Sequence, residues 1–105
     1  MQQLTNEQLH DACTNTGSTI TLNLPLPDTP AKATRLANQI AHWLNADASE
    51  IDWGADRMQV LLRQHDKRVL LCIEWLCDAI WLEPVGGYCD ISVLWQWITP
   101  GSTAQ

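Results

Sequence analysis

The middle of the chain alternates between apolar runs and short polar breaks. Residues 57–65, 68–76 and 79–83 are rich in leucine, β-branched and aromatic side chains, and Asp66-Lys67 and Cys77-Asp78 separate them. Runs of this length and composition, joined by tight polar turns, predict an antiparallel meander of three strands. We therefore expect the fold to be built around this meander.

One face of the predicted meander suits a hydrophobic core. Side chains alternate between faces along a strand, and residues opposite each other across a ladder share a face. A two-residue turn at each break pairs Met58 with Trp75 and Trp75 with Ile80, and a four-residue turn would keep the same faces. Apart from Gln64, this core face is apolar: Met58, Val60, Leu62, Val69, Leu71, Ile73, Trp75, Ile80 and Leu82.

The opposite face, called the outer face below, mixes apolar and charged residues. It consists of Arg57, Gln59, Leu61, Arg63, Leu70, Cys72, Glu74, Leu76, Ala79, Trp81 and Glu83. A solvated face would be polar throughout, whereas apolar side chains rimmed by charge commonly mark contact sites. Two interpretations stay open, a partner surface or partial cover by the chain's own termini.

A short helix and a strand are expected before the meander. Residues 4–13 predict the helix, with Thr5 as its N-cap and Gln8 in the reciprocal position of a capping box. Residues 19–26 alternate between apolar and polar side chains, which predicts a half-exposed strand beside the meander. Pro25 places the end of this strand at a sheet edge, because proline cannot donate to a ladder.

A second helix follows, with Thr29 as N-cap and Pro30 at its first position, and apolar residues recur at helical spacing to about Ala46. The next loop, residues 47–56, is acidic and contains Trp53. A tryptophan in a loop usually pins that loop to the core. We therefore expect Trp53 to have a structural role.

The segment 90–98 fits two patterns. As a helix it has Asp90 as its cap and one apolar stripe, whereas the alternation of its residues also fits a strand. A cap directly after the Gly86-Gly87 break favours the helix. The expected fold is a single α+β domain of residues 1–105 with a polar tail at 99–105. It has a four-stranded, mainly antiparallel sheet with two helices on one face, in the order (α)βαβββα.

Charge and apolar content narrow the classes of partner. The formal net charge of −6 at pH 7 disfavours general affinity for nucleic acid or anionic membranes. The N-terminus lacks the basic and apolar segments of a secretory signal, and Glu74 and Asp78 interrupt the most apolar run, which is too short to cross a bilayer. We expect a cytoplasmic protein with no nucleic-acid or membrane partner.

The cysteines do not form a recognisable site. The spacing of Cys13, Cys72, Cys77 and Cys89 matches no zinc ribbon or redox pair, so we expect free thiols and no cofactor. Cys89 precedes the expected cap of the last helix, where the helix dipole would lower its pKa. No histidine is placed near it to act as a base, and a structural or incidental thiol is the simpler interpretation.

Two carboxylates on the outer face are a candidate for chemistry. The expected pairing makes Glu74 and Glu83 diagonal neighbours, roughly 7–8 Å apart, a distance at which they could hold a cation or divide acid and base roles. Arg57 is a comparable neighbour of Glu74, so a cross-strand ion pair is the simpler interpretation. No phosphate-binding glycine loop, paired-cysteine motif or nucleophile motif occurs, and nothing specific supports an enzyme.

Trp81 lies among the apolar residues of the outer face, and tryptophans are over-represented in interface hot spots. We therefore expect a non-catalytic binding or interaction module that forms a homodimer or contacts another protein. The alternative is a small enzyme or ligand- or cation-binding protein that uses Glu74 and Glu83 with Arg57 or Arg63. The candidate binding surface comprises Arg57, Leu61, Arg63, Leu70, Cys72, Glu74, Leu76, Trp81 and Glu83.

The run from Glu74 to Glu83, EWLCDAIWLE, resembles a segment of a small family of uncharacterised bacterial proteins. In that family an apolar strand ends in glutamate and is followed by a strand of the form (Ser/Asp)-Ala-x-Trp-Leu-Glu and by a closing helix. The resemblance implies a helix rather than a strand at residues 90–98. It implies no activity.

Overall fold

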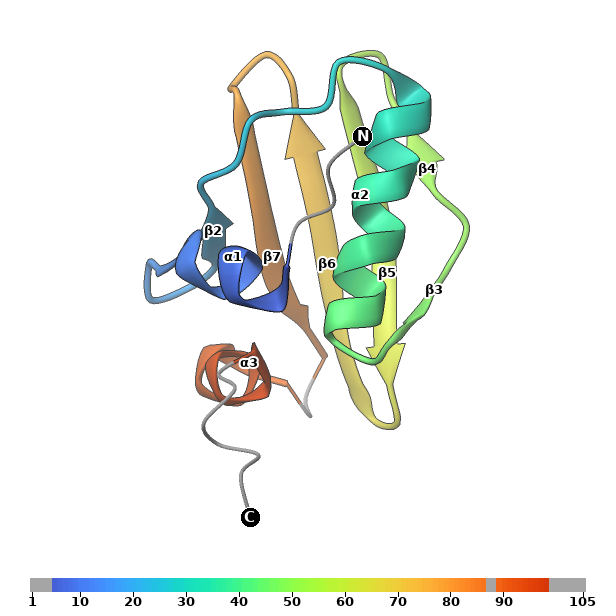
Figure 1. Cartoon of the computed structure of the whole chain (residues 1–105). Coiled ribbons are helices and arrows are strands. Elements are labelled where there is room, and N and C mark those ends of the chain that lie inside the picture. The colour runs from blue at the N-terminus through green and yellow to red at the C-terminus, as the bar shows by residue number, and fades with distance from the viewer. Residues whose placement is uncertain (1–4, 87–88, 99–105) are drawn as a thin grey trace.

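A seven-stranded antiparallel sheet packs against helices in the computed structural model of this protein (Figure 1). The structure describes residues 5–86 and 89–98. The helices are α1 (Asn6–Asp11), α2 (Pro30–Trp43) and α3 (Ile91–Ile98). The strands are β1 (Cys13–Asn15), β2 (Ile20–Leu22), β3 (Asp47–Ala48), β4 (Asp52–Trp53), β5 (Arg57–Gln64), β6 (Lys67–Glu74) and β7 (Ala79–Val85).

The α+β class and the central meander are confirmed, but the expected four strands are too few. The strands follow the order β1-β2-β7-β6-β5-β3, and β4 also pairs with β5. The three unpredicted strands, β1, β3 and β4, contain only two or three residues each. Such short pieces show no apolar periodicity, and backbone pairing with a long neighbour defines them.

The faces of the meander are as expected, although its register is displaced by two residues. The first turn is His65-Asp66, so that Gln64 pairs with Lys67 and Met58 with Ile73 instead of Trp75. The second turn has four residues, Trp75 to Asp78, and Glu74 pairs with Ala79. A displacement of two residues preserves the alternation, so the predicted core-face residues that remain in the strands are buried, except for the half-buried Gln64. Trp75, also expected on the core face, lies in the second turn instead and is half-buried.

The expected strand at residues 19–26 ends early, as β2. The Asn23 amide donates to the carbonyl of Ala12 and the Leu24 amide to that of Leu22, which takes the chain out of the ladder with β7. Pro25 therefore lies beyond the strand. The sheet edge is β1, which pairs with β2 on its other side.

The helix caps match the expectation from the sequence. Thr5 and Gln8 complete the capping box of α1. The Thr29 hydroxyl accepts from the Lys32 amide at the start of α2, and Asp90 Oδ1 accepts from the Val93 amide at 2.9 Å. The helix interpretation of residues 90–98 is confirmed, whereas the expected tail at 99–105 lies outside the described residues.

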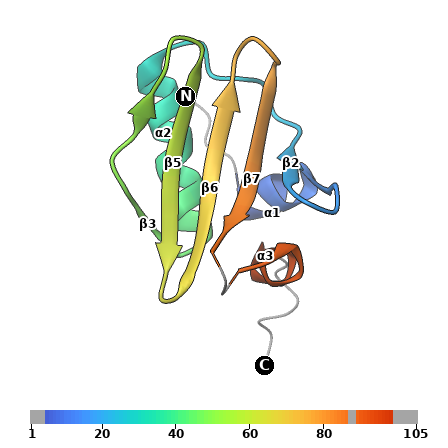
Figure 2. The ribbon, with the colours of Figure 1, turned by 180° about the vertical axis from the view of Figure 1, so that it is seen from behind.

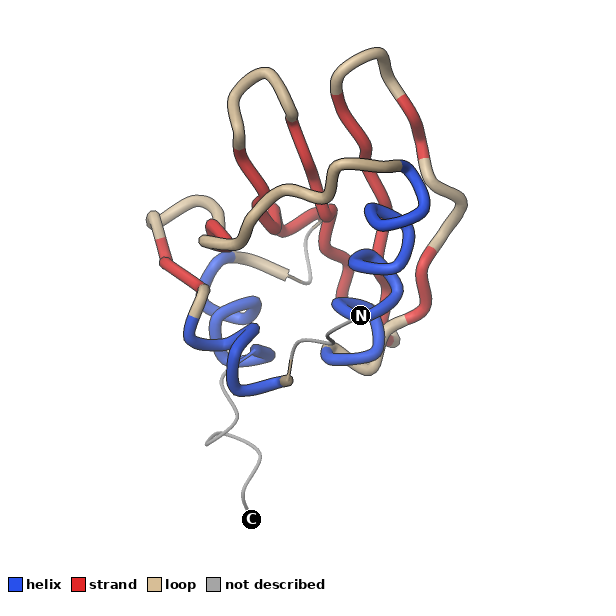
Figure 3. The backbone as a smooth tube through the Cα atoms, turned by 45° about the horizontal axis from the view of Figure 1, so that its top comes forward, coloured by secondary structure: helices blue, strands red, loops and turns tan. Residues whose placement is uncertain are grey.

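The helices close the core on one side of the sheet (Figure 1 and Figure 3). Gln64, the polar exception on the core face, lies beneath the end of α2, where its amide donates to the carbonyls of Leu44 and Asn45. The Trp97 indole also donates to the Leu44 carbonyl, at 2.9 Å, and thereby ties α3 to α2. These donors satisfy carbonyls that a helix end leaves unpaired. Within the described residues, no helix has the length and apolar character needed to cross a membrane.

Candidate functional site

The outer face of β5, β6 and β7 is bare in the part of the chain that the structure describes. Figure 2 shows these strands from behind, with the helices on their far side. The alternative expectation, cover by the chain's own termini, falls on residues 1–4 and 99–105, which lie outside the described residues. The face has an apolar centre of half-buried side chains, Leu61, Leu70 and Trp81.

Cys72 occupies the middle of this centre and is buried despite lying on the outer face. It pairs with Gln59 on one side and with Trp81 on the other, and these long side chains cover it. Burial raises the pKa of the Cys72 thiol to about 11, and the charges of Glu83 and Glu74 add to the effect. Cys72 is therefore a packing residue of this surface.

The observed register separates the carboxylates of Glu74 and Glu83, which the expected pairing had made diagonal neighbours. Glu83 pairs with Leu70, four residues from Glu74 along β6, which corresponds to roughly 13 Å of strand. The diagonal contact was wrong because it assumed a two-residue second turn. The described residues also contain no group of three or more metal-ligating side chains.

Arg57 lies directly opposite Glu74, but the expected ion pair is not among those formed by the described residues. Its side chain packs over the backbone of Gly54 instead, where an added Cβ would come within 2.8 Å of Arg57 Cγ. A larger residue at position 54 would displace this arginine. Arg57, the first residue of β5, lies at the end of the outer face where β6 finishes.

Contrary to the expectation, Leu76 does not lie in the sheet. It lies in the four-residue turn after β6, and 82% of its surface is exposed. The neighbouring Cys77 is also exposed, and the Glu74 carboxylate, through a hydrogen bond and its charge, raises the pKa of this thiol. Leu76 therefore extends the candidate surface past the end of β6 and into the turn.

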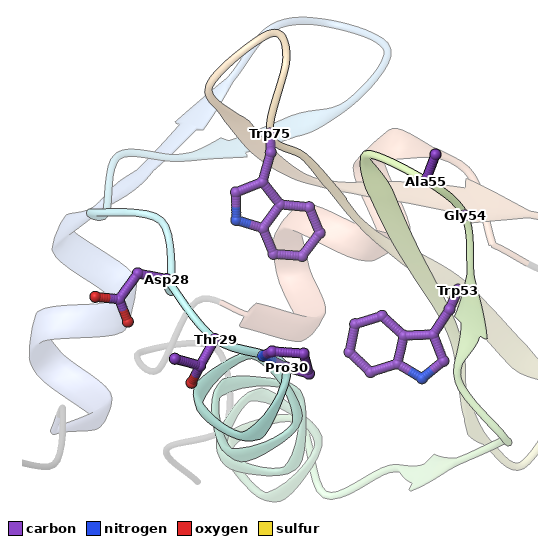
Figure 4. A pocket seen from close by; sticks show the side chains of 7 residues that line it. All are labelled: Asp28, Thr29, Pro30, Trp53, Gly54, Ala55 and Trp75. Atoms are coloured by element: carbon purple, nitrogen blue, oxygen red, sulfur yellow. The ribbon is translucent and has the colours of Figure 1, made fainter.

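Trp53 was expected to pin its loop to the core, but 45% of its surface is exposed. It lies on β4 opposite Met58 and lines an open cleft with Trp75 and the start of α2 (Figure 4). The turn residues Gly54-Ala55-Asp56 before an apolar strand were the available signal. They indicate a hairpin, and in the structure the four residues Gly54 to Arg57 separate the paired Trp53 and Met58.

A family comparison covers most of this architecture. The model of a family described as a protein of unknown function, DUF3630, matches residues 13–97. The chain belongs to the DUF3630 family. The matched region extends from β1 into α3 and includes the outer face and the cleft, whereas α1 precedes it.

Membership of an uncharacterised family, suggested by ten residues around Trp81, is thus confirmed over a much longer stretch. No curated protein and no solved structure matches this DUF3630 chain. The helix that the resemblance implied at residues 90–98 is present as α3.

The pKa shift of Cys89 in the DUF3630 chain is opposite to the one expected from the helix dipole. It lies before α3 but is buried, and desolvation raises the pKa of its thiol, where the helix dipole alone would lower it. Because the thiolate is the reactive form, this environment disfavours a nucleophile. The structural interpretation of Cys89 is therefore favoured.

The thiols should differ in reactivity. All four cysteines are free, and only Cys77 is exposed. At pH 8, iodoacetamide should modify Cys77 first, because burial holds the pKa of Cys13 at about 12 and helps to hold that of Cys72 at about 11. Raising the pH should increase labelling of Cys72 as its thiolate forms. Mass spectrometry of timed samples would measure this order, with urea-unfolded chain as the control; equal rates for Cys72 and Cys77 in the native chain would contradict the described burial.

Proposed function

We propose that this chain is a non-catalytic interaction module that forms a homodimer through the outer face around Trp81. The observation that carries the proposal is the contrast between the two sides of the sheet. The helices cover the core side, whereas no described element crosses the apolar centre formed by Leu61, Leu70 and Trp81 (Figure 2). Apolar centres with a charged rim are typical of protein interfaces.

The charges around this centre favour a second copy as the occupant. The rim carries both signs, with Arg63 and Arg68 paired at one end of the meander and Glu74 paired with Arg57 at the other. A two-fold axis across β6, between Leu70 and Cys72, would place Glu74 of each copy over Arg68 of the other. A symmetric dimer forms each such contact twice, which is why self-complementary faces favour isologous pairing.

The dimer is testable by mass in solution. Light scattering at increasing protein concentration should give a dimer mass for the unmodified chain and a monomer mass for Trp81→Glu, because the substitution places a charge in the apolar centre. Trp53→Glu is the matched control, since Trp53 lies outside the outer face, and it should stay dimeric. Circular dichroism would confirm that both variants are folded. A monomer mass for the unmodified chain at all concentrations would refute the proposal.

Charge exchange tests the same interface if Trp81→Glu does not fold. Glu74→Arg and Arg68→Glu should each weaken the dimer, because each brings like charges together across the proposed axis. The double variant should recover it, by at least about tenfold in dissociation constant relative to either single variant. A double variant as weak as the single ones would show that this orientation of the two copies is wrong.

The proposal retains the expected cytoplasmic location, with no nucleic-acid or membrane partner. The alternative, an enzyme or cation-binding protein based on Glu74 and Glu83, loses its geometric support, because the register separates these carboxylates by four positions.

A further inference from the structure

Two turns at one end of the sheet each present a tryptophan. Trp53 ends β4, before the turn closed by the Gly54 amide and the Arg57 carbonyl, and Trp75 begins the turn after β6. The Trp75 amide donates to the Asp56 carbonyl at 2.9 Å, which joins the two turns. The indole of Trp75 also donates to the Pro27 carbonyl at 2.7 Å. These bonds fix Trp75 relative to the start of α2.

The space between these tryptophans is an open cleft of about 240 Å³. Figure 4 shows the rings of Trp53 and Trp75 on two sides of it and Pro30 between them at the start of α2, whereas the carboxylate of Asp28 is directed away from the rings. The remaining lining residues are Thr29, Gly54 and Ala55. This volume suits a group of a few heavy atoms enclosed on two sides by aromatic rings.

The charge around the cleft is negative. Asp28 is the charged residue of the lining, and its partner Lys32, at 3.0 Å, is not part of that lining. This exposed pair is weak and can share its carboxylate with a ligand. On the two turns, in the segment before α2 and in its first turn, the charged residues are Asp28, Asp56, Asp78 and Lys32, and the Arg57 side chain packs over Gly54.

The start of a helix normally favours an anion, but at the start of α2 fewer backbone amides are available to bind one. Pro30 has no amide hydrogen, and the Lys32 amide is taken by the Thr29 hydroxyl. Aromatic faces attract cations through the ring quadrupole, and tryptophan does so most strongly. Elsewhere in this chain the Lys67 ammonium already lies 5.0 Å from the centre of the Trp97 ring.

We propose that the cleft between Trp53 and Trp75 binds the trimethylammonium group of a small organic cation. The two indoles line the space that the methyl groups would fill, and the Asp28 carboxylate contributes longer-range attraction from beside the cleft. A quaternary ammonium ion suits this site because it is weakly hydrated and has no hydrogen-bond donors, which the apolar walls could not satisfy. The site is separate from the outer face and does not depend on the dimer.

The probe is choline, with 3,3-dimethyl-1-butanol as its uncharged isostere. Titration followed by indole N–H signals in ¹⁵N-correlated NMR should shift those of Trp53 and Trp75 and give a dissociation constant on the order of millimolar, as expected for an open site with two rings. The uncharged analogue should bind at least about tenfold more weakly. A peptide containing trimethyllysine is a second arm; if it binds much more tightly than choline, the cation belongs to a protein partner.

Two variants separate the site from general surface effects. Trp53→Leu removes an exposed ring and should abolish saturable binding of choline, whereas Trp81→Leu, on the outer face, should leave it unchanged. Asp28→Asn should weaken choline and leave the uncharged analogue unaffected. Equal binding of choline and its analogue, or no saturable shift at about 100 mM choline, would overturn the proposal. Neither result would bear on the dimer, which scattering tests independently.

Discussion

Leu71→Ala should lower the free energy of unfolding by about 3 kcal/mol, the usual cost of truncating a fully buried leucine. Leu71 lies on the central strand β6 between Val60 and Leu82, and none of its surface is exposed. The substitution removes packed methyl groups and leaves a cavity that a sheet cannot easily collapse. Urea denaturation followed by circular dichroism would measure the change.

Leu70→Ala is the matched control, because it is the same substitution one residue earlier on the same strand. Leu70 lies on the outer face and is half-buried, so a loss of about 1 kcal/mol is expected. The measurement belongs at low protein concentration, where association through the outer face contributes least. Equal losses for the two variants would contradict the assignment of the two faces.

Trp75→Phe should destabilise the chain by about 1–2 kcal/mol. The substitution keeps an aromatic ring but removes the indole N–H that donates to the Pro27 carbonyl at 2.7 Å, a contact between residues 48 positions apart. Leaving the half-buried Pro27 carbonyl without a donor costs more free energy than the hydrogen bond itself contributes. Chemical denaturation would measure the loss, and hydrogen exchange should increase in the loop before α2.

Trp81→Phe provides the comparison for this second prediction. The Trp81 indole donates to the Glu83 carboxylate at 3.2 Å in an exposed position, where water can replace it. A change of less than about 0.5 kcal/mol is therefore expected. If Trp81→Phe were the more destabilising variant, the bond to Pro27 would not be what ties the turn after β6 to the segment before α2.

The outer face and the cleft place the tryptophans of this chain in different roles. Trp75 and Trp97 each donate to a backbone carbonyl and connect elements distant in sequence. Trp53 and Trp81 make no such long-range bond among the contacts of the described residues. They lie on opposite sides of the sheet, so variants at the two positions test the dimer and the cation site separately.

Some features follow from the sequence because they depend on local pattern. The capping residues Thr5, Thr29 and Asp90 each satisfy an amide within three residues, so that no tertiary contact is needed to recognise them. The division of the meander into two faces is equally robust, since an even displacement of register leaves every side chain on its side.

Other features required the assembled fold. The turn positions depend on backbone conformation, with His65 and Asp78 at positive φ, and this choice moved Glu74 and Glu83 apart along the ladder. The exposure of Trp53 likewise depends on where α2 begins and on the pairing of β4 with β5.

The sequence by itself determined the α+β class, the three helices, the caps and the sides of the central strands, because periodicity and capping act over a few residues. Only the tertiary structure decided the register, the three short strands, the burial of Cys89 and the cleft that joins Trp53 to Trp75. These depend on contacts between residues far apart in the chain, and such contacts leave no periodic trace in the residues that make them.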